Sequence, residues 1–582
     1  MSFMVGVGGR RLAVAMISLI PSAGFAQDIS GLPTREQVEL PEIDRAEDRG
    51  RIDIRDRTAP SEPCAFSSST LGIDLERVRY VPIEGEPPLP AEISQLIAGV
   101  QPAPGMQPLS NLCRVRDAAS ERLAAAGYLA SVQIPPQEIT TGEAKLQVIL
   151  ARLVEIKLEG APGPYGDTLA ARAAQLKALR PFNRFAAERV LLLAGDVPGL
   201  EVAMTLRSAG TTPGEVIGTL AVGYVPWTLI GNVQNSGSRL VGRTSGTARA
   251  EFYGLTGLSD RTFIGVSSTA DFEEQRVVQA GHMFGDSRGN SLGLRASAAW
   301  SRPDLDSLDL RSKSLIVGLD GSTALVRSLD RNLTLGGGFE LIDQSVRLHG
   351  GGDSLAVTRD KLRVAFGRLA GSIRAPRADG RDAFALGGSL ELRKGLDLFG
   401  ASERGQVYDD GATLSRAAGN PQAFVARGGF EGLASAGLAS LAVSVQGQWA
   451  NDPLLSIEEF GVGNLTIGRG YDPGITSGDR ALGVRLEPRF QLPLRGTIGA
   501  QLFAFRDAVR IWNLDPFATE NGRTLVSWGG GARFSLGRRF GLEAIYARPS
   551  DRGQSTDTRR APDRLLISLT AQLSPAVRQG VK

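Results

Sequence analysis

Strict alternation of apolar and polar side chains runs through much of the chain beyond about residue 210. In residues 292–300 (LGLRASAAW) every second position is leucine, alanine or tryptophan, and residues 441–449 (LAVSVQGQW) and 565–573 (LLISLTAQL) show a similar pattern. Successive side chains of a strand point to opposite faces, so each segment predicts a strand with one apolar and one polar face. Strands of about nine to eleven residues of this kind are typical of a barrel that crosses a membrane.

A charged strand of the same kind follows a long glycine-rich segment, Gly461–Asp479, which carries Arg469, Gly470 and Tyr471. Its two faces are Leu482, Val484, Leu486 and Phe490 on one side, and Gly483, Arg485, Glu487 and Arg489 on the other. A soluble β-sandwich would have to bury one of these faces. A membrane barrel instead directs the apolar face to lipid and the charged face to a wet lumen. The segment therefore indicates a membrane barrel with a charged interior.

The length of this strand-rich region sets the size of the barrel. Roughly 360 residues, at about 22–24 residues per strand with its share of the loops, predict a transmembrane antiparallel β-barrel of about 16 strands. Trp300 and Trp449 fall at strand ends, where they suit either an aromatic girdle at the membrane interface or an ordinary core.

Residues 71 to about 224 read differently, as two mixed α+β units of about 75 residues each. The first unit predicts strands over 73–80, 131–134 and 145–158 and helices over 90–100 and 109–126. The second predicts strands over 154–158, 200–206 and 215–224 and helices over 168–179 and 184–193. The same order of elements occurs twice, which indicates an internal structural repeat.

The N-terminus has the three parts of a secretory signal peptide. Arg10 and Arg11 precede the apolar run 12–20, and residues 24–26 (GFA) supply the small residues of a cleavage site, so the mature chain is expected to start near Gln27. No later stretch reaches the ~18–20 apolar residues of a membrane-spanning helix. The chain is therefore expected to be exported and to enter a membrane only as a closed barrel, because open strand edges cannot face hydrocarbon.

Residues 27–62 are polar, charged and almost free of aromatic residues, which is typical of a linker. Within them Thr34, with Gln37 three residues on, predicts a short helix over residues 34–40. The expected organisation is a signal peptide (1–26), a linker with a possible short plug helix (27–62), a first domain (63–151), a second domain (152–209) and a barrel (210–582) with a loop near 456–480 that folds into the pore.

Composition and charge exclude several functions. The chain has 582 residues with 72 glycines and a net charge of only +3, which suits strands joined by turns and gives no case for nucleic acid as a partner. The two histidines, His282 and His349, lie far apart, so no Ser-His-Asp, Cys-His or zinc arrangement can be assembled. Glycine runs such as 336–338 lack the strand-to-helix context of a phosphate loop. We expect no enzyme activity, no cofactor, no metal and no nucleotide.

The chain has two cysteines, Cys64 and Cys113, both in the first α+β unit. In an oxidising compartment an even pair within one small domain is most simply a disulfide. Two unrelated buried thiols are the alternative.

Several motifs resemble the outer-membrane transporter of two-partner secretion, the TpsB type of the haemolysin secretion/activation family within the BamA-like superfamily. Residues 63–66 (PCAF), 127–129 (GYL) and 134–137 (IPPQ) with Gly142 resemble the first polypeptide-transport-associated (POTRA) domain of that family, and residues 192–199 (LLAGDVPG) with 213–214 (PG) resemble the end of the second. Residues 235–239 (NSGSR) with 242–243 (GR) resemble the start of the barrel, and residues 469–471 (RGY) with 477–479 (SGD) resemble its pore loop.

The resemblance implies a role for the loop arginine. In that family it engages an aspartate on an inward-facing strand; here the matching stretch, residues 503–507 (FAFRD), makes Asp507 the candidate partner of Arg469, with Glu487 as the second candidate. A guanidinium paired with a carboxylate would give the loop a fixed register in a polar lumen. The chain departs from the family pattern at Gly468, where a β-branched residue is usual, and at Val509, where glycine is usual.

The function that the resemblance implies is secretion. An unfolded exoprotein, adhesin-like or haemolysin-like, would meet the POTRA domains in the periplasm and pass without ATP through a barrel in the bacterial outer membrane, with or without activation. The loop around Arg469 would have to move or rearrange. Outer-membrane lipids and the barrel-assembly machinery are the other expected partners. Two alternatives are an insertase that folds other barrels, which usually has more POTRA units, and a passive porin, which leaves residues 71–208 without a purpose.

Overall fold

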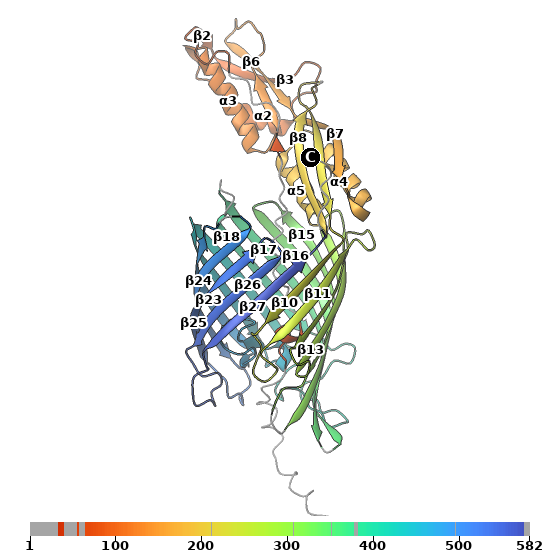
Figure 1. Ribbon diagram of the computed structural model, residues 1–582. Helices are drawn as coiled ribbons and strands as arrows, with labels where there is room; N and C mark the ends of the chain where they lie inside the picture. Colours follow the sequence, from red (N-terminus) through yellow and green to blue (C-terminus); the bar gives the residue numbers. More distant parts are fainter. Residues whose placement is uncertain are drawn as a thin grey trace, which may run out of the picture.

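The computed structural model of the chain describes residues 33–39, 55–56, 64–210, 212–305, 308–350, 352–377, 382–494 and 496–575. These residues form a large β-barrel with two small α+β domains stacked beyond one of its mouths (Figure 1). We call the mouth that faces these domains the near mouth and the opposite one the far mouth. The expected signal peptide lies outside the described residues.

Sixteen antiparallel strands close the barrel, which confirms the number expected from the length of the region. Closure is made by β10 against β27, with Leu229 opposite Leu573. The strands are β10 (Trp227–Gln234), β11 (Ser245–Tyr253), β12 (Arg261–Thr269), β13 (Gln275–Gly285), β14 (Asn290–Ser301), β15 (Asp309–Arg327), β16 (Arg331–Gly350), β17 (Asp353–Pro376), β18 (Asp382–Gly395), β19 (Phe424–Ala436), β20 (Ala439–Ala450), β23 (Arg480–Leu492), β24 (Ile498–Trp512), β25 (Thr524–Leu536), β26 (Phe540–Pro549) and β27 (Arg564–Leu573).

The outer wall of the barrel is apolar and exposed, as the alternation predicts. On β14, Leu292 and Leu294 are 53% and 56% exposed, and on β23 Leu482 is 51% exposed, whereas the inward Glu487 is 2% exposed. Trp300 and Trp449 are exposed at the far ends of their strands, in positions that suit an interfacial girdle. Such a surface requires hydrocarbon around it, and a closed barrel leaves no strand edge in that hydrocarbon.

The first domain packs two helices on a small sheet. Its core is made by apolar side chains of both layers, among them Ile93, Leu112 and Leu146. The expected strand over residues 73–80 is two strands, because the first part pairs with β4 and the second with β6. The elements are β2 (Gly72–Leu75), β3 (Arg77–Pro82), α2 (Ala91–Ala98), β4 (Gly105–Pro108), α3 (Ser110–Ala125), β5 (Ala130–Gln133) and β6 (Glu143–Leu150).

The second domain repeats this plan with the sheet order β1-β8-β9-β7. Its elements are β7 (Arg152–Gly160), the 3₁₀ helix η1 (Gly163–Tyr165), α4 (Gly166–Ala178), α5 (Arg184–Gly195), β8 (Leu200–Ser208) and β9 (Glu215–Tyr224), and the linker adds the short β1 (Arg55–Asp56). None of the helices in the described part of the chain is both long and apolar enough to cross a membrane.

Two expected boundaries differ in the structure. The single strand expected over residues 145–158 is divided at Ala151, because β6 belongs to the first sheet and β7 to the second. The second domain ends after Tyr224 rather than at residue 209, because β9 pairs with both β7 and β8 and so completes the sheet of that domain.

The second domain is fixed to the near mouth by ionic and backbone contacts. Arg327, at the end of β15, donates from Nε and Nη2 to Asp196 at 2.8 and 2.5 Å. The backbone N–H of Leu329 in the next turn donates to Glu188 on α5 at 2.6 Å. These contacts therefore fix the orientation of the second domain relative to the barrel.

Candidate functional site

Two segments of the chain occupy the lumen of the barrel. The first is the long loop of residues 451–479 between β20 and β23, which contains the 3₁₀ helix η2 (Ser456–Glu458) and the short strands β21 (Phe460–Val462) and β22 (Thr476–Gly478). The second is the linker helix α1 (Arg35–Val38), which begins after Thr34, where the Gln37 side chain accepts the Thr34 N–H at 2.9 Å. Both segments contact inward-facing side chains of the wall, so their attachment decides whether the lumen is open.

Arg469 attaches the loop to two strands at once. Its Nε and Nη2 donate to the two carboxylate oxygens of Asp507 on β24 at 3.3 and 2.9 Å, and its Nη1 donates to Glu487 on β23 at 2.5 Å. The Arg469 side chain is 7% exposed, and those of Asp507 and Glu487 are 0% and 2% exposed. The structure thus joins Arg469 to both candidate partners, where the sequence offered them as a first and a second choice.

Further donors surround the two carboxylates. Asp507 also accepts from the backbone N–H of Arg469 at 3.0 Å and from Nη2 of Arg485 at 3.0 Å. Glu487 accepts from Nη1 of Arg533 at 2.7 Å. Charge-assisted bonds of this kind are the strong ones, and here each carboxylate has several. We call Arg469, Arg485, Glu487, Asp507 and Arg533 the loop cluster.

Aromatic rings on β24 lie beneath the loop cluster. The guanidinium carbon of Arg469 lies 3.7 Å from the ring centroid of Phe505, and that of Arg533 lies 3.9 Å from the centroid of Phe503. A guanidinium over an aromatic face is attracted by the ring quadrupole while its N–H groups stay free to bond in their own plane. Strand β24 therefore packs an aromatic ring against each guanidinium, and its Asp507 also accepts hydrogen bonds from Arg469.

Gly470 and Tyr471 fix the turn after the arginine. Gly470 has φ +93°, and a Cβ at this position would lie 3.0 Å from the Cβ of Ala547 and 3.1 Å from Pro549. The hydroxyl of Tyr471 donates to the Val526 carbonyl at 2.8 Å, and burial raises the pKa of Tyr471 to about 12. The turn thus needs glycine for space and the tyrosine as a buried polar contact with the wall.

The two departures from the family pattern lie at this contact. Gly468 has φ +117°, a conformation that a β-branched residue rarely adopts, so the loop of this chain follows a path that glycine permits. Val509 is 1% exposed and belongs to one apolar cluster with Val462, Ile467 and Tyr471 of the loop. The larger side chain on β24 is therefore used to pack the loop.

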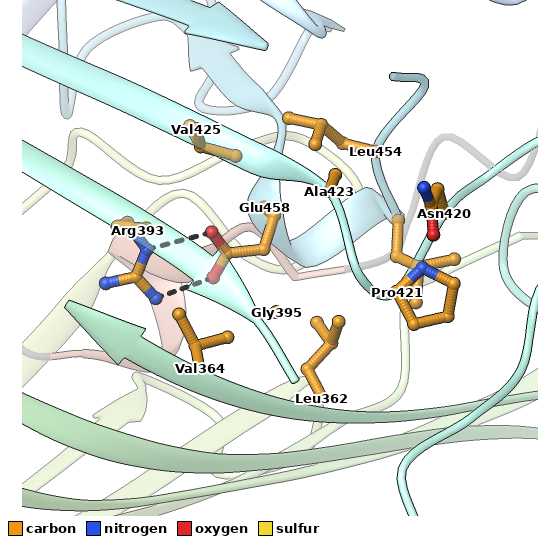
Figure 2. A pocket seen from close by; sticks show the side chains of 11 residues that line it. Leu362, Val364, Arg393, Gly395, Asn420, Pro421, Ala423, Val425, Leu454 and Glu458 are labelled. Carbon is orange, nitrogen blue, oxygen red and sulfur yellow. Dashed lines mark hydrogen bonds and ion pairs between the residues drawn. The ribbon is translucent and has the colours of Figure 1, made fainter. Parts of the chain in front are cut away.

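The linker helix is held by a second ionic group. Arg35 donates from Nη2 to Glu340 on β16 at 2.6 Å and from Nη1 to Glu458 of the loop at 3.0 Å. Arg393 on β18 joins the same two carboxylates, with Nη2 at 2.6 Å from Glu340 and 2.9 Å from Glu458. Figure 2 shows its contact with Glu458. We call Arg35, Glu340, Arg393 and Glu458 the helix cluster. It connects the linker, the wall and the loop through shared carboxylates.

Apolar and backbone contacts complete the seat of α1. Val38 is fully buried in a cluster with inward side chains that include Ile316 and Ile342. Its carbonyl accepts from the hydroxyl of Ser297 on β14 at 2.6 Å. A cavity of about 230 Å³ remains beside Glu39, lined by β11 to β15. A space of this size holds a small group of waters.

At the far mouth Asp479 joins three loops. It accepts from Nη1 of Arg416 at 2.5 Å, from the backbone N–H of Leu454 at 2.7 Å and from that of Leu514 at 2.7 Å. Asp479 ends the motif 477–479 that the sequence singled out without assigning a role. Asp479 thus connects the pore loop with two other loops at the far mouth.

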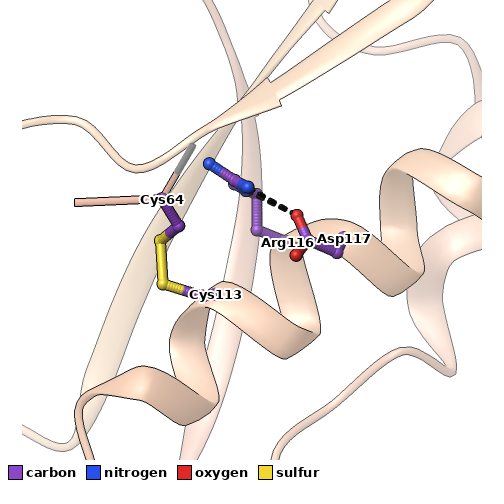
Figure 3. The surroundings of a disulfide bond; sticks show 4 residues. All are labelled: Cys64, Cys113, Arg116 and Asp117. Atoms are coloured by element: carbon purple, nitrogen blue, oxygen red, sulfur yellow. Dashed lines mark hydrogen bonds and ion pairs between the residues drawn. A yellow bond between two sulfur atoms is a disulfide. The ribbon is translucent and has the colours of Figure 1, made fainter. Parts of the chain in front are cut away.

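The two cysteines lie outside the barrel, in the first domain. Cys64 and Cys113 form a disulfide with 5.9 Å between their Cα atoms, and Cys113 lies on α3 (Figure 3). The bond ties the C-terminal end of the linker to that helix. Among the described residues no group of three or more His, Cys, Asp or Glu side chains is placed to hold a metal.

Sequence reasoning missed part of this arrangement. It did not identify Arg533 or any member of the helix cluster, whose residues come from segments far apart in the sequence. The available signal was charge at inward positions of alternating strands, as on β16 and β18. That signal predicts that a side chain faces the lumen, but it does not predict which residue across the lumen the side chain contacts.

Comparison with known proteins gives one family. Residues 308–534, which span β15 to most of β25 and include the pore loop, match the family model described as haemolysin secretion/activation protein ShlB/FhaC/HecB. A curated relative, the outer membrane transporter CdiB-2 of Burkholderia pseudomallei (strain 1026b), is 24% identical over 438 residues, which cover 72% of this chain and 71% of the relative.

Two solved structures share the architecture. CdiB from Escherichia coli aligns with a TM-score of 0.66 at 17% identity, over 89% of this chain and 94% of that one. CdiB from Acinetobacter baumannii aligns with a TM-score of 0.58 at 16% identity, over 90% of this chain and 95% of that one. At these identities the likeness is one of fold.

Proposed function

We propose that the chain is a member of the haemolysin secretion/activation family of two-partner secretion transporters and exports an unfolded partner exoprotein through its own barrel in the bacterial outer membrane. The near mouth then faces the periplasm, where the two α+β domains act as POTRA domains, and the far mouth faces the outside. We assign no catalytic step to the chain.

One observation carries the proposal most directly. The lumen is filled by two segments that are not part of the wall, each held by ionic side chains of the loop and helix clusters. Ionic contacts in a wet lumen can be exchanged for water or for other polar groups, whereas a packed apolar core cannot. A luminal segment can therefore leave the pore without unfolding of the barrel wall.

Capture of the exoprotein is assigned to a sheet edge of the second domain. The outer edge of β8 already accepts a strand, because β1 pairs with it in parallel at Thr205 and Leu206. An extended segment of exoprotein can add to such an edge through backbone hydrogen bonds, which give affinity with little demand on side chains. The nine residues of β8 offer a longer edge than the two that β1 uses.

Opening of the pore is assigned to α1. Glu340 and Glu458 keep Arg393 as a partner when Arg35 leaves, so departure of the helix leaves no bare carboxylate on the wall. The chain then passes from the periplasmic to the extracellular mouth and folds outside. Folding of the cargo there supplies the direction without ATP.

Two other functions make distinct predictions. An insertase would be needed for other barrels, so its depletion would lower many outer-membrane proteins together. A passive porin would conduct small solutes and leave secretion of a neighbouring exoprotein unchanged when deleted. The two stacked domains and the occupied lumen favour secretion over both.

The experiment that tests the proposal follows the partner exoprotein in culture medium. Deletion of this chain should abolish its appearance outside the cell while other outer-membrane proteins keep their levels. Arg469→Ala and Asp507→Ala should each reduce secretion although the barrel is inserted, which heat-dependent migration in gels verifies. Unchanged secretion in the deletion strain would refute export, and unchanged secretion in both variants would refute the role of the loop cluster.

A further inference from the structure

Basic side chains flank two exposed tryptophans on the lipid-facing wall. Trp300 on β14 lies opposite Arg276 on β13 and opposite Lys313 on β15. On another part of the wall, Trp528 on β25 lies opposite Arg506 on β24 and opposite Arg548 on β26. We call these sets of three residues the first and the second triad.

All six side chains of the triads are exposed on the outer face. Trp300 and Trp528 are 44% and 48% exposed, and the four basic residues alternate along their strands with buried, inward-facing neighbours. Directly opposite residues of antiparallel strands have Cβ atoms about 4.5–5.5 Å apart. Each triad therefore places one cation on each side of one indole ring.

Both triads lie toward the far mouth. Arg276 and Trp300 are next to the far ends of β13 and β14, and Arg548 is next to the far end of β26. At the near mouth Trp227, also exposed, lies opposite Phe252 instead of a basic residue. The flanking cations thus belong to the outer leaflet side of the barrel.

The neighbours of the triads add positive charge. Arg510 follows Arg506 by four positions, hence on the same face, and lies 5.2 Å from the ring centroid of Trp512. The guanidinium of Arg548 lies 5.8 Å from the Trp528 ring. The carboxylate of Asp563, near the second triad, already accepts from Arg560 and from the Tyr546 hydroxyl.

The first triad has a similar surround. Arg276 donates from Nε to the Phe272 carbonyl at 2.6 Å, and Asp309 accepts from Arg302 and Arg311 at 2.8 Å each. Lys313, two residues after Arg311 on β15, is also exposed. Each region therefore carries more cationic than anionic groups on its outer face.

A cation on the lipid face of a barrel is unfavourable near the centre of the bilayer and tolerated near the headgroups. Tryptophan prefers the same depth, because its ring is apolar and its N–H is polar. Two cations around an indole match an anionic headgroup whose oxygens can accept from both. Arginine in particular binds phosphate oxygens in a forked geometry.

We propose that the two triads bind the phosphate groups of anionic lipids in the outer leaflet, and thereby fix the depth of the barrel and hold lipid against β13–β15 and β24–β26. The proposal depends on the membrane location of the barrel and is independent of what the barrel transports. Free phosphate shares the same chemistry, so the test separates it from lipid.

The test uses the full mature chain in detergent micelles containing lipid A, a glycolipid with two phosphate groups, and measures retained lipid by native mass spectrometry. Removing all four cations (Arg276→Gln, Lys313→Gln, Arg506→Gln and Arg548→Gln) should reduce retained lipid at least fivefold. A matched control neutralises two exposed arginines at the near mouth, Arg288→Gln and Arg539→Gln, and should retain lipid as the wild type does.

Three further arms complete the design. Dephosphorylated lipid A should bind the wild type as weakly as lipid A binds the fourfold variant, and millimolar inorganic phosphate should not displace lipid A. The conservative pair Arg506→Lys and Arg548→Lys should keep most of the binding, which excludes misfolding as the cause of a loss. Equal retention by the wild type and the fourfold variant would overturn the proposal, and full displacement by inorganic phosphate would overturn its assignment to lipid.

Discussion

The loop and the linker helix both fill the lumen, yet they are attached in different ways. The loop joins the wall at both ends, through β20 and β23, and adds the loop cluster, the Tyr471 hydroxyl and an apolar cluster around Val509. The helix has four residues and is held by Arg35, by the burial of Val38 and by the ion pair of Glu39 with Arg295 on β14. The loop is therefore a fixed part of the barrel, and the helix is a removable one.

The difference lies in what each departure leaves behind. If the loop leaves, Asp507 loses two backbone donors, and the inward apolar surface of Val509 and Ile511 is exposed to water. If the helix leaves, Arg393 still binds Glu340 and Glu458. The sequence led to the expectation that the loop around Arg469 must move. Release of the helix alone costs less free energy than release of the loop, so we expect the pore to open by departure of the helix.

The largest effect is expected for Asp507→Ala. The change leaves Arg469, Arg485 and the loop amides without their common acceptor, and breaking a buried ion pair by removing one partner costs about 3–5 kcal/mol. Denaturant unfolding of the purified barrel measures the loss, and secretion should fall at least tenfold. Asp353→Ala, an exposed carboxylate on β17, is the control; equal stability of the two variants would show that the loop cluster holds nothing.

Gly470→Ala should have the next largest effect. The left-handed conformation costs an alanine about 1–3 kcal/mol, and its Cβ would press on Ala547 and Pro549. The loop should become more accessible to protease added from outside, while strand content by circular dichroism stays unchanged. Gly496→Ala, in a turn at the near mouth with φ +77° and open space around it, separates backbone strain from crowding.

Tyr471→Phe tests the buried hydrogen bonds of one hydroxyl. It removes the donor to the Val526 carbonyl and the acceptor of the Asp551 backbone N–H, and leaves the ring in its apolar cluster, so the free energy of unfolding should fall by about 1–3 kcal/mol. Urea unfolding measures it. A loss as large as that of Asp507→Ala would mean that the tyrosine, rather than the ion pairs, carries the attachment.

Arg35→Glu should have the smallest effect on barrel stability and a large one on opening. The new carboxylate would face Glu340 and Glu458 and expel the helix, while Arg393 keeps both of these carboxylates paired. Stability should change by less than about 1 kcal/mol, because Glu340 and Glu458 lose Arg35 and keep Arg393 as a partner. Conductance in planar bilayers should rise, and Arg45→Glu elsewhere in the linker should leave it unchanged.

The sequence predicted the barrel well because its signal is local. Period-two alternation depends only on neighbouring residues, and it gave the lipid face and the inward position of Glu487. The number of strands came from the length of the region, and the position of Asp507 came from the resemblance. The boundary between β6 and β7 at Ala151 and the assignment of β9 to the second domain could not be predicted, because both depend on which strands pair. The pairing of Arg469 came from resemblance, and the helix cluster escaped because four distant segments supply it.

The most direct test of the central claim crosslinks each segment to the wall in turn. Val38→Cys with Ser297→Cys ties the helix to β14, and Ile467→Cys with Gly483→Cys ties the loop to β23, where a Cβ on residue 483 would lie 3.1 Å from that of Ile467. Secretion is followed with and without reductant, with the wild type as control for the native disulfide. The account predicts that the helix crosslink stops secretion until it is reduced, and that the loop crosslink leaves secretion intact. Secretion through a barrel whose helix is crosslinked would contradict it.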